Sequence, residues 1–351
     1  MKKWPLFLTA ALMLGLYGVF LAFWFSPREA PAAPTTEATT TVTTLPATEP
    51  TTQATTEPTT EPTTEATTEA TTEPATVPTT EPLPAPPDES VLNASTVFVY
   101  DLTAERMLYT LGDQNQTLAP ASLTKLMTTL IVLEHLKPET VVEAGPEASW
   151  VAAGSSVAAI NYGNRLTVEM LLEGMLTQSG NDAAYVLAVA AGRAIAGNEA
   201  LSAEDALAAF LEEAKSKCEE LGLEGSCFLN PDGYDTEGHY SSPADLLKLA
   251  CLVSREPLAR KYMTVEREHV VFASGQDYIW ENTNLLVRTN SQYYCKDAFG
   301  LKTGSTDNAG YCLIAGFERD GRTLIIGVLG CSAPMHRFED ALYLYEHFIN
   351  Q

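Results

Sequence analysis

The sequence predicts an α+β fold in which one antiparallel sheet is built from both ends of the folded region, with flanking helices and an inserted helical lobe. Two observations lead to this prediction. Segments rich in β-branched and aromatic residues lie at 97–111 and again at 299–329. Between them, apolar residues recur with a helical period in several segments. Strands grouped apart from helices are typical of this fold class.

The N-terminus is expected to be a membrane anchor. Lys2 and Lys3 precede an uncharged, apolar run at 4–25, which is long enough to span a bilayer. We therefore expect residues 1–30 to form a signal anchor with a transmembrane helix. The lysines place the N-terminus inside and the rest of the chain on the extracellular, cell-wall side. Cleavage of this segment and secretion of the remainder is the alternative.

Residues 31–89 are expected to be a disordered linker. They repeat Thr, Glu, Pro and Ala, with no basic residue and few apolar side chains beyond alanine. Such a composition cannot bury a hydrophobic core. The remaining residues, 90–351, are enough for one well-packed domain. The formal net charge of −24 argues against a nucleic-acid partner.

The folded region opens with a β-hairpin at 97–111, followed by an apolar helix that Pro138 ends. Ser122 and Lys125 stand at the start of this helix, three residues apart and therefore on one face. Burying a lysine costs free energy unless the amine is paired or loses its proton. A neutral amine beside a hydroxyl activates the hydroxyl as a nucleophile. The alternative is a lysine that extends to water and has no chemical role.

A second group of polar residues lies between two helical segments. Residues 140–164 are expected to form a loop, and helices are predicted from 168 to 176 and from 183 to 196. The loop between the two helices contains Ser179 and Asn181. It also contains Asp182, for which an ordinary N-cap role is the alternative to a functional one.

The next helices carry clear start signals. A helix is predicted at 203–220, and Ser242-Pro243 with Asp245 has the pattern of a capped helix start. We therefore expect structural roles for Asp245 and His239. No motif supports a Ser/His/Asp triad that would use His239.

The last third of the chain is predicted to form β-strands and one final helix. Strands are expected at 299–303, 310–317 and 323–329, with a tight turn before the last strand and a final helix at 338–348.

Lys302, Thr303 and Gly304 lie at the first of these strands. A strand edge that pairs with an extended peptide needs a cation for the peptide carboxylate, a hydroxyl for orientation and a glycine for close backbone approach. These three residues supply all three groups. A surface turn with an exposed lysine is the alternative.

Six cysteines lie in the folded region, and none has the spacing of metal ligands. Cys218 and Cys227 are close enough in sequence to form a disulfide. Burial of the six as small apolar residues remains an equal alternative.

The order Ser122-x-x-Lys125, Ser179-x-Asn181, Lys302-Thr303-Gly304 is similar to the three-motif signature of the penicillin-recognising serine acyltransferases. Over about residues 94–351 the chain resembles the low-molecular-weight penicillin-binding proteins of the D-alanyl-D-alanine carboxypeptidase family. Further segments that carry this resemblance are Asn230-Pro231-Asp232-Gly233 and His239-Tyr240-Ser241-Ser242. The resemblance implies a β-lactamase/transpeptidase-like fold.

The resemblance also implies a reaction. Ser122 would attack the carbonyl between the two terminal D-alanines of a peptidoglycan stem peptide, and water would hydrolyse the resulting acyl-enzyme. Lys125 would be the general base, with its pKa lowered by burial and by the nearby cation Lys302. Ser179 would relay the proton to the leaving amine, and Asn181 would orient Lys125 and the substrate.

The same resemblance assigns the substrate contacts. Lys302 and Thr303 would hold the terminal carboxylate, Gly304 would be a further substrate-binding residue, and the backbone N–H groups of Ser122 and Ser305 would form the oxyanion hole. β-Lactam antibiotics would acylate the serine and inhibit the enzyme. No metal or cofactor is expected.

Two other functions remain open. A class A β-lactamase shares the motifs but needs a glutamate-led loop, and the candidate segment from Glu224 to Asn230 lacks the expected pattern. The other is a cell-wall-binding surface protein on the same fold that has lost its catalytic activity.

Overall fold

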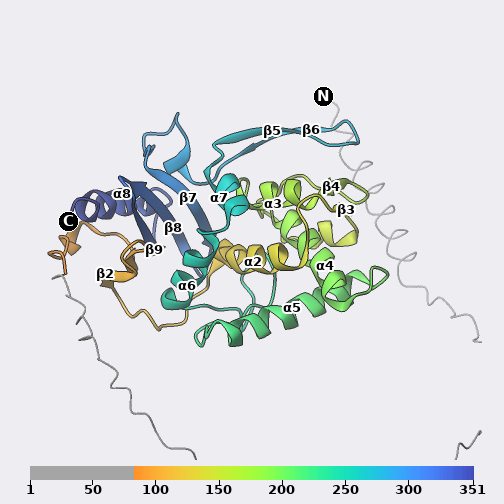
Figure 1. Cartoon of the computed structure of the whole chain (residues 1–351), viewed down its shortest axis with the longest axis horizontal. Coiled ribbons are helices and arrows are strands. Elements are labelled where there is room, and N and C mark those ends of the chain that lie inside the picture. Colours follow the sequence, from red (N-terminus) through yellow and green to blue (C-terminus); the bar gives the residue numbers. More distant parts are fainter. Residues whose placement is uncertain (1–82) are drawn as a thin grey trace, which may run out of the picture. The chain divides into compact units, whose positions relative to one another are not determined.

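The computed structural model describes residues 83–351 (Figure 1). The expected signal anchor at 1–30, and the expected linker as far as residue 82, lie outside the described residues. Among the residues that are described, no helix has both the length and the apolar character needed to cross a bilayer.

The centre of the fold is a five-stranded sheet with the strand order β2-β1-β9-β8-β7, in which every neighbouring pair is antiparallel. The strands are β1 (Thr96–Asp101), β2 (Arg106–Leu111), β7 (Ala298–Thr306), β8 (Gly310–Arg319) and β9 (Arg322–Cys331). The first two strands come from the start of the domain and the other three from its end. The expected sheet built from both ends is therefore confirmed.

Both faces of this sheet are covered. Phe98, Ile314 and Ile325 pack into the core shared with the helical lobe, whereas their neighbours along the strands, such as Val97 and Ile326, pack under the last helix. This alternation follows from the two-residue period of a strand. The last helix, α8 (His336–Phe348), packs against β8 and β9.

The other helices gather on the side of the sheet opposite α8 (Figure 1). They are α2 (Lys125–His135), α3 (Val168–Leu176), α4 (Asn181–Ala196), α5 (Ala203–Glu220), α6 (Pro243–Val253) and α7 (Pro257–Thr264). Short 3₁₀ turns are η1 (Glu89–Val91), η2 (Ala121–Thr124), η3 (Pro146–Ser149) and η4 (Leu285–Val287). Helix α2 contacts α4, α5 and α6, so it is the core helix of the lobe.

The helix expected around Ser122 differs in one respect. Ser122 lies in η2, and the α-helix itself begins at Lys125 and ends at His135. The cause is a tighter first turn, because Leu123 N–H donates to the carbonyl of Pro120 rather than to a residue four positions back. The nucleophile candidate and the lysine therefore belong to adjoining helical segments.

Several short elements escaped prediction. The expected loop at 140–164 contains β3 (Val141–Glu143) and η3, and β3 pairs with β4 (Arg165–Thr167). A second hairpin, β5 (Arg267–Val271) with β6 (Asp277–Glu281), was also missed. These strands are mostly exposed, so they lack the apolar alternation by which a half-buried strand is recognised.

Two contacts tie the first described residues to the last helix. The carbonyl of Ala85 lies 2.8 Å from His347 Nε2, and Asp88 N–H donates to the Tyr343 hydroxyl at 2.8 Å. Two residues within the segment expected to be linker thus contact the last helix.

All six cysteines are free thiols. Cys218, Cys312 and Cys331 are buried, and the others are half-buried. Burial raises the pKa of the Cys218 and Cys331 thiols to about 12, so these thiols stay protonated and unreactive. No disulfide forms among the six, and burial, the other alternative, is found for three of them.

Candidate active site

Ser122 and Lys125 lie in direct contact. Lys125 is completely buried, and its Nζ atom donates to Ser122 Oγ at 2.9 Å, to Asn181 Oδ1 at 2.7 Å and to the carbonyl of Asp232 at 2.8 Å. These three acceptors use all the hydrogens of an ammonium group. The amine is thus fixed in position beside the serine hydroxyl.

Burial lowers the pKa of Lys125 to about 8, although the negative charges of Asp232 and Asp182 raise it. The charge of Lys302 was expected to lower the pKa of Lys125, but the main effect is that of Lys125 on the pKa of Lys302. Burial, followed by the charges of Lys125 and Arg337, lowers the pKa of Lys302 well below its usual value. Two carboxylates favour the charged form of Lys125, whereas no acidic group favours that of Lys302, so Lys125 holds its proton more firmly.

The backbone is strained on both sides of this pair. Ala121, next to the nucleophile candidate, has φ +49°, and Ser179 has φ +60°. Residues other than glycine seldom adopt this left-handed region, and such strain is concentrated at functional sites.

The second motif joins the helical lobe to the sheet. Ser179 lies in the loop between α3 and α4, and its Oγ accepts a hydrogen bond from Lys302 Nζ at 2.8 Å. Asn181 is the first residue of α4 and contacts Lys125. The N-cap position belongs to Gly180 rather than to Asp182. The Asp182 carboxylate instead accepts from the backbone N–H groups of 158 and 160, each at 2.8 Å, and so holds that loop beside the site.

The third motif lies on β7, which is one of the two edge strands of the sheet. Lys302 is buried, and Thr303 Oγ1 lies 2.6 Å from the hydroxyl of Thr283. A Cβ atom on Gly304 would come within 3.1 Å of the Ala121 side chain, so glycine permits the close approach of this strand to the nucleophile turn.

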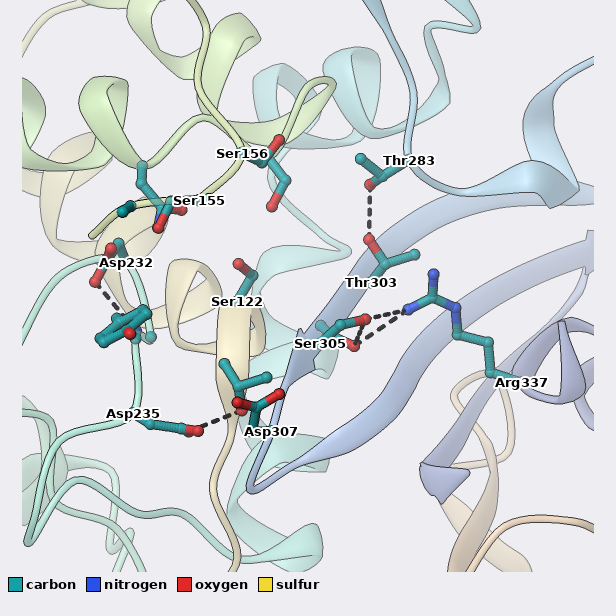
Figure 2. A pocket seen from close by; sticks show the side chains of 18 residues that line it. Ser122, Ser155, Ser156, Asp232, Asp235, Thr283, Thr303, Ser305, Asp307 and Arg337 are labelled. Carbon is teal, nitrogen blue, oxygen red and sulfur yellow. Dashed lines mark hydrogen bonds between the residues drawn. The ribbon is translucent and has the colours of Figure 1, made fainter. Parts of the chain in front are cut away.

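Arg337, near the start of α8, was not predicted as a site residue. Its Nη1 donates to the carbonyl of Gly304, to Ser305 Oγ and to the carbonyl of Cys312. Figure 2 shows this side chain directed across β7 toward Ser305. No motif surrounds Arg337 in the sequence. Only the packing of α8 against the sheet brings it here.

These groups meet at one cleft of about 380 Å³. All the predicted residues line it except the two lysines, which lie buried behind Ser122 and Ser179. The predicted lining residues are Ser122, Ser179, Asn181, Thr303, Gly304 and Ser305. The cleft also contains Thr283, Asp232 and Arg337, which were not predicted as site residues.

His239 and Asp245 have structural roles, as expected. His239 Nε2 lies 2.9 Å from Thr124 Oγ1, and its Nδ1 accepts from the N–H of Leu229. Burial lowers the pKa of His239 to about 4, so the ring is neutral. Asp245 accepts from Gly225 N–H and from the Ser226 hydroxyl.

Glu224 was the candidate for a lactamase-type glutamate. It is exposed and lines a separate hollow with Lys248. It does not line the cleft.

Among the described residues, one group has the composition of a metal site. Ligand atoms of Glu134, His135 and Glu213 lie within 4.8 Å of one another. Glu134 is paired with Lys217 at 2.6 Å and His135 with Glu213 at 3.2 Å. The group is outside the cleft lining, so the chemistry of the cleft does not involve it.

A serine hydroxyl paired with a buried lysine, beside a strand edge and a second serine, defines the class of serine acyl-transfer sites in which lysine takes the place of histidine. The particular family follows from comparison with known proteins. Residues 83–333 match the Peptidase_S11 family model, described as D-alanyl-D-alanine carboxypeptidase. The chain belongs to this family, as the three motifs indicated.

Individual relatives agree. The chain is 33% identical over 254 residues to the D-alanyl-D-alanine carboxypeptidase DacF of Bacillus subtilis, covering 70% of this chain but 59% of that protein. It is thus similar to little more than half of this relative. The structure of the Streptomyces K15 DD-transpeptidase is similar, with a TM-score of 0.66, 27% identity and coverage of 74% of this chain and 98% of that one.

A second solved structure is penicillin-binding protein D2 of Listeria monocytogenes in its ampicillin-bound form. It has a TM-score of 0.59, 29% identity and coverage of 74% of this chain and 98% of that one. Together, these neighbours confirm the expected fold.

Proposed function

We propose that this protein is a serine-type D-Ala-D-Ala carboxypeptidase. It removes the terminal D-alanine from peptidoglycan stem peptides through an acyl-enzyme on Ser122, and β-lactams acylate the same serine. The observation that carries the proposal is the 2.9 Å contact between the buried Lys125 amine and Ser122 Oγ. The names of the relatives support the substrate class, and the ampicillin-bound neighbour supports β-lactam binding.

In the acylation step, neutral Lys125 accepts the proton of Ser122 as Oγ attacks the carbonyl carbon of the penultimate D-alanine. Ser122 and Ser305 both line the cleft, and their backbone N–H groups stabilise the developing oxyanion. One such donor is worth about 3 kcal/mol of barrier. The leaving D-alanine amine receives its proton from Ser179, whose hydroxyl contacts Lys302.

The terminal carboxylate needs a cation that the substrate can reach. Lys302 was expected in this role, but it is 1% exposed, with its amine directed to Ser179 and to the carbonyl of Thr303. We assign the direct contacts to the Thr303 hydroxyl and to the Arg337 guanidinium. Arg337 lines the cleft, and a guanidinium can bind a carboxylate through two parallel hydrogen bonds.

Incubation with a penicillin, followed by intact-protein mass spectrometry, tests the proposal. Wild type should gain the mass of one penicillin, and Ser122→Ala should gain none. An adduct that persists in the variant would mean that Ser122 is not the nucleophile. A protein that never forms the adduct would support a wall-binding role without catalysis, and rapid turnover of penicillin would indicate a β-lactamase.

Release of D-alanine from a D-Ala-D-Ala pentapeptide then tests the natural reaction. Hydrolysis alone supports a carboxypeptidase. Transfer of the acyl group to an added amine would support a transpeptidase, the activity for which the Streptomyces K15 protein is named.

We further propose that the N-terminal segment anchors the catalytic domain to the outer face of the cytoplasmic membrane. The support is the uncharged run at 4–25 behind Lys2 and Lys3. Fractionation of cells tests this proposal, because the full-length chain should sediment with membranes and a chain that begins at residue 31 should not.

A further inference from the structure

Asp232 has a carboxylate oxygen that the fold leaves unused. The residue is 1% exposed and lines the cleft, yet its Oδ2 atom has no hydrogen-bond partner in the structure. A buried carboxylate oxygen without a donor costs at least about 1–3 kcal/mol. Such a group at the cleft wall requires an explanation.

The turn that carries Asp232 is held firmly against α2. Thr128 Oγ1 donates to the carbonyl of Pro231 at 2.7 Å, and Lys125 Nζ donates to that of Asp232. Gly233 has φ +87°, and a Cβ atom there would lie 1.8 Å from the carbonyl oxygen of Ala121. The backbone of this turn therefore fixes where the carboxylate lies.

None of the contacts that hold this turn depends on the carboxylate group of Asp232. The only described hydrogen bond to the side chain is from Tyr234 N–H to Oδ1 at 3.2 Å. This is a common turn contact that asparagine makes equally well. Asp232 forms no ion pair with Lys125, although its charge raises the pKa of that amine. The negative charge and the free oxygen are thus available for the reaction.

Figure 2 shows where this oxygen could act. Asp232 is on the wall formed by the 230–233 turn, and Thr303 and Ser305 are on the opposite wall, with Ser122 between them. The β7 wall supplies the proposed contacts to the oxyanion and to the terminal carboxylate of the substrate. The Asp232 wall is therefore left for a molecule that approaches an acyl group on Ser122 from the other side.

We propose that Asp232 is a positioning residue for hydrolysis, whose Oδ2 accepts a hydrogen bond from the water molecule that attacks the acyl-enzyme. The inference rests on the proposed function. The water oxygen forms a bond to the acyl carbon while its proton passes to neutral Lys125. The bond between that carbon and Ser122 Oγ then breaks, and Oγ takes the proton back from Lys125. The products are the shortened peptide acid and free serine.

The test separates acylation from deacylation. Asp232→Asn keeps the shape of the side chain and the contact with Tyr234, but a neutral amide orients a water molecule less firmly than a carboxylate does. With a labelled penicillin, we expect deacylation to slow by about tenfold or more. The acylation rate should stay within about twofold or rise, because the charge that holds a proton on Lys125 is gone.

Asp113→Asn is the matched control. Asp113 is exposed, outside the cleft lining, and its Oδ1 accepts from the N–H of Asn115, two residues on. The control therefore removes the same charge from the same kind of turn, and both rates should equal those of wild type.

Unchanged deacylation in Asp232→Asn, or equal losses in both steps, would overturn the proposal. If Asp232→Asn has a melting temperature well below that of wild type, the acylation and deacylation rates are measured in Asp232→Ser instead. The same criteria then apply to these two rates. Failure of wild type to form any penicillin adduct would instead contradict the proposed function. The two failures are thus distinguishable.

Discussion

Lys302 Nζ donates a hydrogen bond to Ser179 Oγ across the boundary between sheet and helical lobe, at 2.8 Å and over 123 residues of sequence. This contact joins the second motif to the third, just as the contact of Lys125 with Asn181 joins the first to the second. The two lysines thus bridge the three motifs. The charge of Lys125 also lowers the pKa of Lys302.

The pKa of Lys125 predicts the pH dependence of acylation. Because the pKa is lowered to about 8, roughly a tenth of the amine is neutral at pH 7, far more than for an ordinary lysine. The neutral amine is the reactive form. The acylation rate by penicillin should therefore rise about tenfold per pH unit below pH 8 and level off above it. A rate that is flat between about pH 6 and pH 9 would contradict the role of Lys125 as base.

Asn181→Asp should move this profile to higher pH. The substitution puts a negative charge where Asn181 Oδ1 now lies, 2.7 Å from Lys125 Nζ, and it should raise the pKa of the amine by about 1–3 units. Acylation near neutral pH should fall accordingly. Asn198→Asp adds the same charge at an exposed position just beyond the end of the same helix, and it should leave the profile unchanged. Equal shifts in both variants would refute a local effect.

Arg337→Leu should weaken recognition of the substrate carboxylate. Loss of a charged hydrogen-bonding group should lower kcat/KM for a D-Ala-D-Ala peptide roughly tenfold to a hundredfold. A peptide with an amidated C-terminus should lose much less. Arg337→Lys keeps the charge and should be intermediate. If both peptides lose activity equally in Arg337→Leu, Arg337 acts by supporting Gly304 and Cys312, whose carbonyls it also contacts.

Gly233→Ala should damage the nucleophile turn. Beyond the strain of φ +87°, the new Cβ atom would lie 1.8 Å from the Ala121 carbonyl oxygen, so we expect more than about 3 kcal/mol of lost stability together with slower acylation. Gly163→Ala is the control, with φ +80° and open space around the added atom. It should cost only about 1–2 kcal/mol. Similar melting temperatures for the two variants would show that the turn adapts.

The sheet and the three motifs could be predicted because their signals are local. The apolar runs at 310–317 and 323–329 lie within β8 and β9, and each motif lies within a few consecutive residues. The position of Arg337 could not be predicted, because it depends on how α8 packs over the sheet. Thr283 lies in a segment without periodicity, and tertiary packing places it in the cleft lining, where it contacts Thr303.

The direction in which the two lysines shift each other's pKa could not be predicted from the sequence either. An effect of Lys302 on the pKa of Lys125 was implied by the family resemblance. The outcome depends on Asp232 and Asp182, which favour the charged form of Lys125. Asp232 was visible in the sequence only as part of a turn, and the direction of its carboxylate is a product of tertiary packing.

The pairing of β1 with β9 sets the order in which this protein can fold. Phe98 lies opposite Gly327 in that pair. Strand β1 is synthesised early but can pair with β9 only when nearly the whole chain has been made. Closing so long a loop is entropically costly and slows folding. The edge strand β7 gains its support only when β8 and β9 are complete. A chain truncated before β9 would therefore keep Ser122, Lys125 and the other motif residues in its sequence and still lack an assembled cleft.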